Sequence, residues 1–326
     1  MDVLSDVLRA VRLTGAVYFD VRARAPWIAE TPGASGICSR VMPEFEHVIC
    51  FHIMLDGWCW AQLADESEPA VRMEADEAVI VVGGEAHFMG TERGKRSVPD
   101  LDLYYRPRDR PLPFILREVG GTGEPARFVC GYFGCDARPF NPILKSLPRL
   151  LHVRASSEGA KLAHELIRQA LQEMEYPHAG GETILAKLSE LMFLQAIRQY
   201  IDNLPAHSTG WLSGLRDQYV GAALRLMHGH PADPWTLDAL AREVGLSRST
   251  FAERFTDMMG SPPMHYLSNW RLQLAARLLA GQGMSIAKAA AEVGYETEAA
   301  FNRAFKRQVG LPPGAWRRSR ISGIQS

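Results

Sequence analysis

Three side chains in the first half of the sequence could act together as ligands. His52, His87 and Cys130 each fall on a run expected to form a strand or a turn, and a barrel could bring them together. Two imidazoles and a thiolate would suit Zn²⁺. The alternative is a buried cysteine and two histidines with satisfied hydrogen bonds. These residues are therefore a candidate site for a metal, with zinc as the possible cofactor, or for another ligand.

Cys130 is also a candidate redox residue, alone or together with Cys135. A thiol reacts as the thiolate, so the pKa of Cys130 would have to be lowered. A positive charge on His52 or His87 could supply that effect. The remaining cysteines are expected to serve packing: Cys38, Cys50 and Cys59.

Other polar side chains recur in a unit that the second half of the sequence contains twice, about fifty residues apart. In each copy a short apolar helix ends at a glycine, Gly245 or Gly294, and a second helix carries phenylalanines four residues apart. A glycine and a proline pair then end the second helix. This order predicts two helix-turn-helix units, and hence a chain that binds DNA at two adjacent places. An ordinary helical bundle would explain one copy more easily than two.

Helical spacing determines which side chains of these units stay outside. The phenylalanines pack the second helix of each unit against the first, and the opposite face remains available to a groove. Ser247 is a good N-cap, because its oxygen can accept an unpaired backbone N–H. The candidate DNA-contacting residues are Ser247, Arg248, Ser249, Ala252, Glu253, Thr297, Glu298, Ala299, Asn302, Arg303 and Lys306.

The elements that must position these residues fall into two classes. Residues 266–280 predict a long helix that would fix the distance between the two units, so that both could enter successive major grooves about 34 Å apart. Earlier in the chain, Asp56-Gly57 is a hairpin signal. Short strands at even spacing predict a sandwich or small barrel. The expected strands are residues 47–55, 58–63, 78–82, 101–105 and 126–133.

Charge is divided unevenly along the 326 residues. Residues 209–326 hold 14 Lys/Arg and 9 Asp/Glu, a net charge of +5, whereas the rest of the chain has a net charge of −6. A basic part joined to an acidic part suits a DNA-binding domain attached to a domain with another task. We expect a cytoplasmic protein, since the start of the chain is an amphipathic helix rather than a signal peptide and no apolar run is long enough for a membrane.

Residues 156–203 predict two helices broken at residues 176–181. The second helix is more apolar than packing against one barrel requires, so its surplus would bury either inside the chain or against a second copy. The expected organisation is α+β with two domains. It comprises a cupin-like barrel or sandwich with flanking helices at residues 1–155, a dimerising helical pair at 156–203, a linker at 204–210, and an all-α double helix-turn-helix domain at 211–326.

The second half of the chain resembles the DNA-binding domain of the AraC/XylS family of bacterial transcription regulators. The likeness covers residues 220–318 and is strongest at Val293-Gly294-Tyr295, Phe301, Phe305-Lys306 and Gly310-Leu-Pro-Pro313. In that family the second helix of each unit reads the major groove. The resemblance therefore implies base contacts by Ser249, Ala252 and Glu253, and by Glu298, Ala299, Asn302 and Arg303. Some members have arginine where this chain has Glu253. An acidic residue there could accept from cytosine N4 but would repel phosphate, or it could pair with a neighbouring arginine and read no base.

The first half is similar to the cupin-type sensor domains that precede such DNA-binding domains. The similarity is carried by Phe51-His52, Glu85-Ala-His87 and Val129-Cys130-Gly-Tyr-Phe133, in a subgroup that includes an activator sensing reactive chlorine. Enzymatic cupins resemble one another in a His-x-His pair with a carboxylate and a later histidine. Here His47 and His52 are five apart and would face opposite sides of a strand. A sensor is expected, not an enzyme.

Together these patterns predict a homodimeric transcription regulator whose cupin-like domain senses a small molecule, metal or oxidant. Its partners would be double-stranded promoter DNA, an unidentified effector and, for an activator, RNA polymerase, with no membrane. Two alternatives remain. A metal-dependent cupin enzyme with an accessory helical domain would contain Fe or Mn and turn over substrate without DNA. A protein-interaction module would show no salt-dependent affinity for DNA.

Overall fold

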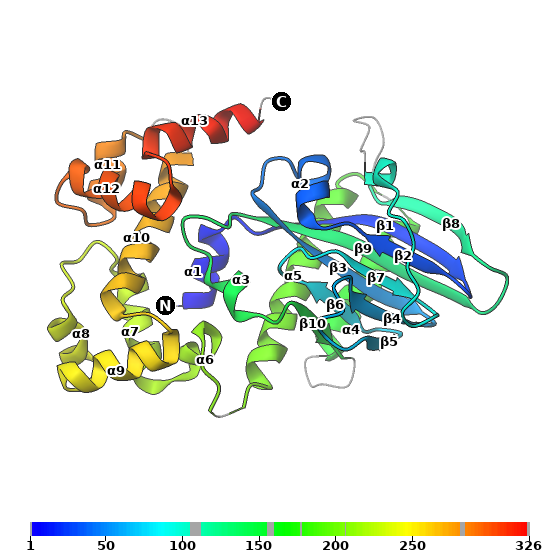
Figure 1. The fold of residues 1–326 in the computed structure, drawn as a ribbon, viewed down its shortest axis with the longest axis horizontal. Coiled ribbons are helices and arrows are strands. Elements are labelled where there is room, and N and C mark those ends of the chain that lie inside the picture. Colours follow the sequence, from blue (N-terminus) through cyan, green and yellow to red (C-terminus); the bar gives the residue numbers. More distant parts are fainter. Residues whose placement is uncertain are drawn as a thin grey trace. The chain divides into compact units, whose positions relative to one another are not determined.

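The chain forms two compact units in a computed structural model that describes residues 2–104, 112–154, 160–176, 178–205, 207–280 and 284–324 (Figure 1). The first, which we call the barrel unit, holds residues 13–135 and 147–202 and contains the β-strands. The second, the helical unit, holds residues 1–12, 136–146 and 203–326. The α+β class with a strand-rich unit and an all-helical unit is confirmed.

Two sheets build the barrel unit. The first has the order β10-β6-β3-β9-β1-β8 and the second the order β2-β7-β4-β5. Strands β1 and β8 run parallel, whereas β9 is antiparallel to both β1 and β3. The strands are β1 (Thr14–Arg24), β2 (Ile28–Thr31), β3 (His47–Asp56), β4 (Trp58–Leu63), β5 (Val71–Glu74), β6 (Ala78–Val81), β7 (His87–Gly90), β8 (Phe114–Gly120), β9 (Pro125–Cys135) and β10 (Leu150–Val153).

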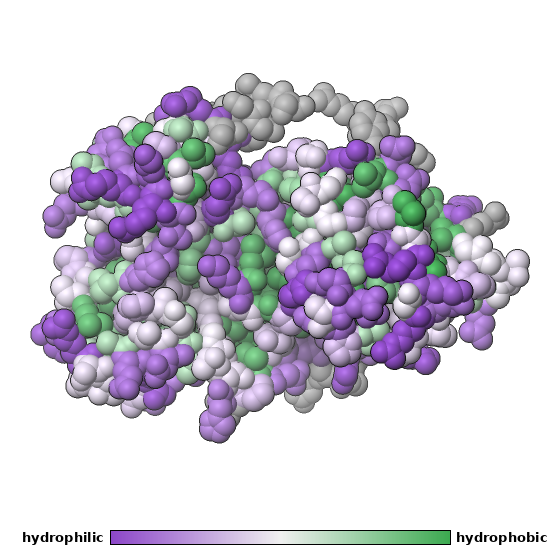
Figure 2. Space-filling view, viewed as in Figure 1, coloured by the Kyte–Doolittle hydropathy of each residue, from purple (hydrophilic) through white to green (hydrophobic). Residues whose placement is uncertain are grey.

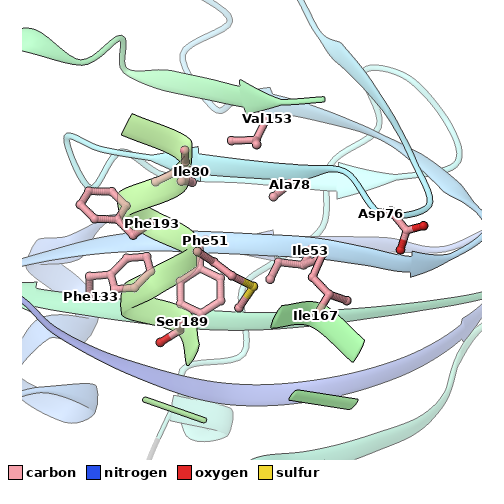
Figure 3. A pocket seen from close by; sticks show the side chains of 12 residues that line it. Phe51, Ile53, Asp76, Ala78, Ile80, Phe133, Val153, Ile167, Ser189 and Phe193 are labelled. Carbon is pink, nitrogen blue, oxygen red and sulfur yellow. The ribbon is translucent and has the colours of Figure 1, made fainter. Parts of the chain in front are cut away.

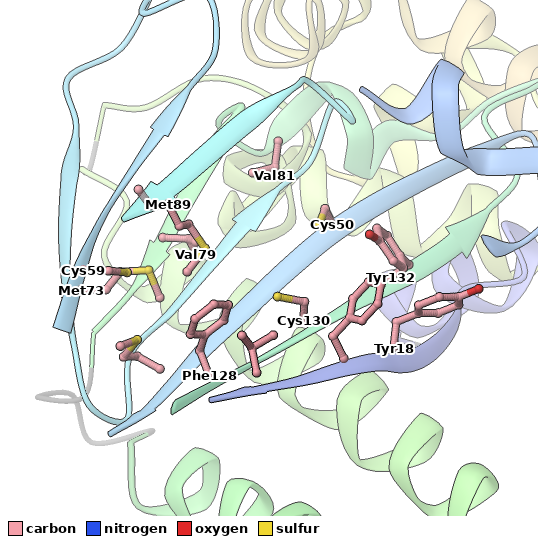
Figure 4. Close-up of a cluster of buried hydrophobic side chains, with 14 of the residues drawn as sticks. Tyr18, Cys50, Cys59, Met73, Val79, Val81, Met89, Phe128, Cys130 and Tyr132 are labelled. Carbon is pink, nitrogen blue, oxygen red and sulfur yellow. The ribbon is translucent and has the colours of Figure 1, made fainter. Parts of the chain in front are cut away.

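Apolar side chains from both sheets meet between them and form the core of the barrel unit (Figure 4). Strand β4 shows the alternation of a half-buried strand, with Cys59, Ala61 and Leu63 turned inward. Strand β3 differs, because its other face is also covered: Phe51 packs against Phe133, which in turn packs against a helix. With both faces covered, β3 has a near-continuous run of buried residues.

The helices of the barrel unit are α2 (Ala34–Val41), α4 (Ala160–Glu175) and α5 (Gly181–Asp202). Figure 3 shows the contact between α5 and the outer face of the first sheet, where Phe193 approaches Phe133 with ring centroids 4.7 Å apart. Gly15 on β1 permits this approach, because a Cβ at that position would overlap Ser189 of α5.

One expected strand is wrong. Residues 101–104 form the 3₁₀-helix η1 (Leu101–Tyr104), and Tyr105 lies outside the described residues. The cause is local, because the Asp100 side chain accepts a hydrogen bond from the backbone N–H of Asp102 at 3.0 Å. Such an aspartate turn offers the backbone a partner that competes with a β-ladder.

The predicted hairpin at Asp56-Gly57 is also wrong, because β3 and β4 belong to different sheets. Both edges of β3 are occupied by β6 and β9, and both edges of β4 are occupied by β5 and β7. Gly57, with φ of +80°, still makes a sharp turn, but this turn carries the chain from one sheet to the other.

The helical unit contains helices joined by turns, and no strand among its described residues. They are α1 (Val3–Ala10), α3 (Pro142–Ser146), α6 (Trp211–Arg216), α7 (Gln218–Gly229), α8 (Leu237–Glu243), α9 (Arg248–Met259), α10 (Pro263–Ala280), α11 (Ile286–Glu292), α12 (Glu298–Val309) and α13 (Pro313–Ile324). Long helix α10 contributes to the core on both sides, because it contacts α9 as well as α11, α12 and α13. None of these helices, nor any other in the described ranges, is long and apolar enough to cross a bilayer.

Two short segments from the first half of the chain pack within the helical unit. Helix α1 contacts α7 and α10, and α3 contacts α6. The side chain of Gln273 on α10, only 1% exposed, donates to the carbonyl of Ala10 and accepts from the N–H of Phe140, both at 2.9 Å. The contacts group residues 1–12 and 136–146 with the helices of the helical unit, although both segments fall within the cupin-like domain expected at residues 1–155.

Candidate functional site

The first helix-turn-helix consists of α8, a turn at Gly245 and α9. Gly245 has φ of +78°, a conformation that a side chain would strain. Ser247 then caps α9 by accepting from the backbone N–H of Thr250 at 3.2 Å. Phe251 and Phe255 are fully buried and fix the inner face of α9. The local sequence thus sets both the turn and the orientation of the second helix.

The second unit repeats this construction with α11, Gly294 and α12. Gly294 has φ of +83°, and Thr297 caps α12 by accepting from the N–H of Ala300 at 3.2 Å. Phe301 and Phe305 are fully buried, and Trp316 of α13 packs against Phe305. Two copies of one motif therefore share helix α10 within a single unit.

The outer faces of α9 and α12 are open to solvent, and the surface over α11 and α12 in Figure 2 is largely hydrophilic. Of the eleven candidate DNA-contacting residues, Ala252 and Asn302 are half-buried. The other nine are exposed: Ser247, Arg248, Ser249, Glu253, Thr297, Glu298, Ala299, Arg303 and Lys306. All eleven side chains are therefore at least partly accessible, and contact with DNA requires such access.

Several of these side chains already have partners, and the Oδ1 atom of Asn302 is buried without one among the described residues. Arg248 lies 3.6 Å from Asp238 in an exposed pair, which contributes little stability. Asn302 donates to Glu298 at the long distance of 3.5 Å. Within the described parts of the chain Glu253 and Arg303 form no ion pair, so the pairing of Glu253 with a neighbouring arginine is not found.

The core beneath α9 and α10 contains a buried histidine. His228 of α7 stacks on Trp270 with ring centroids 4.0 Å apart, and its Nε2 lies 2.9 Å from the hydroxyl of Tyr266. Burial lowers the pKa of His228 to about 3, so the ring is neutral in the folded protein. This polar chain continues to Trp211, whose indole N–H donates to Tyr266.

A cluster of sulfur and imidazole groups lies between the sheets of the barrel unit. His52 of β3 and Cys130 of β9 are direct partners in the β3–β9 register, and His87 comes from β7 in the other sheet. The structure thus brings together all three residues that the sequence singled out. His52, His87 and Cys130 are between 2% and 7% exposed.

Hydrogen-bond distances link the cluster into a chain. His52 Nδ1 lies 2.7 Å from Cys130 Sγ, and His52 Nε2 lies 2.7 Å from His87 Nε2. His87 Nδ1 lies 2.9 Å from the carbonyl oxygen of Glu85. Since a carbonyl only accepts, His87 carries its proton on Nδ1 and presents the Nε2 lone pair to His52.

Cys50 is the member of the cluster that sequence reasoning missed. Its Sγ lies 3.4 Å from His52 Nε2, and it was expected to serve packing alone. The sequence could have indicated this role, because residues 50 and 52 of one strand point to the same face of the sheet. In Figure 4 Cys50 and Cys130 both project into the interior between the sheets.

The redox prediction meets two physical obstacles. Burial raises the pKa of the Cys130 thiol well above its usual value and lowers the pKa of His52, so no imidazolium stands ready to hold a thiolate. Cys135 lies five residues along β9, about 16 Å away at the rise of a strand and on the opposite face. The two sulfurs therefore cannot form a disulfide while β9 is intact. All five cysteines lie in the described ranges, and none is in a disulfide.

A cavity of about 260 Å³ adjoins the cluster inside the barrel unit. His52, Cys130 and Tyr132 reach its wall, and most of the remaining lining is apolar, including Phe19, Phe128 and Met89. A largely apolar hollow with a few convergent polar groups is the usual form of a small-molecule site.

Comparison with known proteins agrees with both units. The family described as "Cupin" matches residues 2–202, and the "Helix-turn-helix domain" family matches residues 240–319. A "Putative AraC-like transcription regulator" of Streptomyces lividans is 29% identical over 98% of each chain. The "HTH-type transcriptional regulator AlkR" of Acinetobacter baylyi is 26% identical over 97% of this chain and 99% of its own.

A further relative is the "RCS-specific HTH-type transcriptional activator RclR" of Escherichia coli. It is 30% identical over 60% of this chain and 68% of its own length. The resemblance inferred from the residues is thereby confirmed on both halves of the sequence. The chain belongs to the AraC-like transcription regulators, and it combines a cupin domain with a helix-turn-helix domain that binds DNA.

Proposed function

We propose that this regulator binds its promoter by inserting α9 and α12 into two successive major grooves. The observation that carries the proposal is the pair of solvent-open outer faces on two copies of one motif, joined by a common helix. Helix α10, with 18 residues, is about 27 Å long, comparable to one turn of B-DNA at about 34 Å. A spine of this length suits two adjacent groove contacts.

Roles differ among the candidate residues. Asn302 and Arg303 on α12 are the strongest candidates for base edges, since an amide suits adenine and a guanidinium suits guanine. The capped ends of α9 and α12, at Ser247 and Thr297, would hold phosphates through their backbone N–H groups. Lys306 would add phosphate contact. Glu253 would accept from cytosine rather than bind phosphate.

The protein would act as a dimer through α4 and α5. Leu162, Ile184 and Leu191 are each between 45% and 49% exposed, although α5 also packs on the sheet through Phe193. A second copy could cover these leucine and isoleucine side chains. Replacing Leu191 with glutamate should shift sedimentation velocity toward the monomer, and Thr122→Glu, at an exposed turn of the same unit away from α4 and α5, should not.

The barrel unit would hold the signal, and its occupation would change DNA binding or activation, with RNA polymerase as the partner of an activator. The cavity next to His52 and Cys130 supports this division of labour. An enzyme is disfavoured, because the barrel unit has no His-x-His pair of the kind that enzymatic cupins use for a metal. Cytoplasmic location follows from this role as part of the proposal.

Selection of binding sites from randomised DNA by the full chain tests this proposal. We expect an enriched site with two blocks about one helical turn apart, and an affinity that falls steeply with salt. Hydroxyl-radical footprinting should protect one face of the duplex over both blocks. A single enriched block, or binding without sequence preference, would contradict the two-groove arrangement.

A further inference from the structure

We propose that Cys50, His52 and His87 form a binding site for a soft or borderline cation, Zn²⁺ or Cu⁺, between the sheets of the barrel unit. The donor atoms are Cys50 Sγ, His52 Nε2 and His87 Nε2, which all lie within 4.8 Å of one another. His52 Nε2 is 3.4 Å from Cys50 Sγ and 2.7 Å from His87 Nε2. One thiolate and two imidazoles favour these ions over Mg²⁺ or Ca²⁺.

The two imidazoles are already anchored as metal ligands usually are. His87 is fixed through its other nitrogen by the carbonyl of Glu85, and His52 through its other nitrogen by Cys130. Ligand histidines in proteins almost always make such a second hydrogen bond, which sets the ring orientation and tautomer. The lone pair of His87 Nε2 therefore points into the cluster before any ion arrives.

This assignment changes the ligand set that the sequence suggested. Cys130 faces Nδ1 of His52, whereas Cys50 and His87 face Nε2 of the same ring. One ion cannot be bound by His52 Nε2 and also lie next to the sulfur on the opposite side of the imidazole. Cys130 is therefore a positioning residue that orients His52, and Cys50 takes its place as the sulfur ligand.

Coordination requires a small opening of the cluster. Tetrahedral Zn²⁺ separates two imidazole nitrogens by about 3.3 Å and an imidazole nitrogen from a thiolate by about 3.6 Å. The nitrogens are now 2.7 Å apart, so the sheets must separate by a few tenths of an ångström at this point. The ion replaces the Cys50 proton, which leaves to solvent, and the His52 proton moves from Nε2 to Nδ1.

The geometry leaves one coordination position for a further ligand. Three protein donors on a four-coordinate ion are typical of zinc sites that exchange a bound molecule, whereas purely structural sites use four. These donors come from β3 and β7, which lie in different sheets. Binding would consequently pull on both sheets at once, and its regulatory meaning rests on the proposed function of the barrel unit.

Metal binding by the full-length protein is the direct test. Equilibrium titration against a chromogenic chelator should give one Zn²⁺ or one Cu⁺ per chain after the protein has been stripped and reduced. Zinc-edge X-ray absorption should then give one sulfur at about 2.3 Å and two nitrogens at about 2.0 Å. A titration without saturable binding, or a spectrum with two sulfurs or none, would overturn the site.

Variants separate the two cysteines. Cys50→Ser should weaken binding at least 100-fold, because the thiolate ligand is lost. Cys130→Ser should weaken it about tenfold or less, since the hydroxyl can still hold His52. Cys59→Ser, at another buried cysteine of the same core, is the matched control and should bind as the wild type does. Loss of binding in Cys130→Ser with retention in Cys50→Ser would contradict the assignment.

DNA binding measured on the same preparations keeps the two proposals apart. A chain that binds its promoter but no metal would reject this site and leave the DNA-binding function intact. A chain that binds metal but no specific DNA would do the reverse. The X-ray absorption measurement on unmodified protein also stands if a variant fails to fold.

Discussion

Arg303 shows what single residues contribute to DNA reading. It is exposed on α12, one position after Asn302, and forms no ion pair within the described chain. We expect Arg303→Ala to cost about 1–3 kcal/mol of binding free energy and to relax selection at one base position. Sites selected from random DNA by the variant would measure this.

The matched control for Arg303 is Arg225→Ala on α7, another exposed arginine of the helical unit. It removes the same charge away from the recognition helices, so base selection should remain as in the wild type. An unchanged selection profile for Arg303→Ala, or the same loss in both variants, would remove Arg303 from the list of base-reading residues.

His228 gives a pH dependence at the same scale. Its pKa is about 3 in the folded chain against 6.5 when unfolded, so between these values the unfolded state binds more protons. This group therefore favours folding above pH 6.5 and loses its contribution as pH falls, by about 1.4 kcal/mol for each pH unit. His228→Phe keeps the stacking on Trp270 and removes the titration.

Urea unfolding of wild type and His228→Phe from pH 7.5 to 5 measures the difference. We expect the wild type to lose free energy of unfolding relative to the variant as the solution becomes more acidic. Parallel curves would mean that His228 has an ordinary pKa. Any constant offset reflects the lost hydrogen bond to Tyr266 and carries no information about titration.

The burial or exposure of a side chain could be predicted where the 3.6-residue period of its own helix decides it. Helical spacing alone placed Phe251 and Phe301 inside and Arg303 outside. The sulfur–imidazole cluster required more, because the β3–β9 register aligns His52 with Cys130 and a second sheet supplies His87. Such long-range strand pairings cannot be predicted from a single sequence.

At the scale of elements, the duplicated turn offers an internal comparison. Gly245 and Gly294 both have positive φ, but a Cβ at Gly294 would lie 2.5 Å from the carbonyl oxygen of Ala232, whereas a Cβ at Gly245 would meet nothing within 4 Å. We expect Gly245→Ala to lower the free energy of unfolding by about 1 kcal/mol. Gly294→Ala should cost at least twice that, because backbone must move.

Denaturant unfolding of both glycine variants, followed by circular dichroism, tests this comparison. Each variant serves as the control for the other, since the substitution and the turn are the same. Equal losses would show that the crowding at Ala232 has no energetic effect. A larger loss at Gly245 would contradict the geometry of the second turn.

Helices were predicted better than strands, since the 11-residue strand β1 and the seven-residue strand β8 were both missed. The helix pair and both helix-turn-helix units follow from apolar spacing over many residues. Strands β2, β5, β7 and β10 have four residues each and lack the continuous apolar run by which the equally short β6 was predicted. The turn at Gly57 was predicted, but the pairing of the strands that flank it was not, because β3 pairs with β6 and β9 rather than with β4.

At the scale of the whole molecule, the helical unit is assembled from three separate stretches of chain. Residues 203–326 alone would lack α1 and the 136–146 segment, and Gln273 would lose both of its buried partners. We expect this fragment to have a lower midpoint of unfolding than the same helices in the full chain. The loss comes from buried apolar side chains of α1, such as Val7 and Ala10, because each square ångström of apolar surface that is no longer buried costs about 25 cal/mol.

Hydrogen exchange read by mass spectrometry makes this comparison on peptides of α7 and α10. Faster exchange in the fragment is the expected result. In the full chain, Gln273→Ala should reproduce part of the effect, and Gln169→Ala, at an exposed position of α4, should not. Equal protection in fragment and full chain would mean that the first two segments add nothing to the DNA-binding helices.

The division of the helical unit among three stretches also constrains how such proteins can exchange parts during evolution. A single recombination event near residue 203 would transfer the third stretch and leave residues 1–12 and 136–146 with the old gene. The hybrid would then hold Gln273 against a foreign Ala10 and Phe140. We therefore expect the cupin domain and the helix-turn-helix domain of such proteins to be inherited together. A hybrid protein should need residues 1–12 and 136–146 transferred along with residues 203–326.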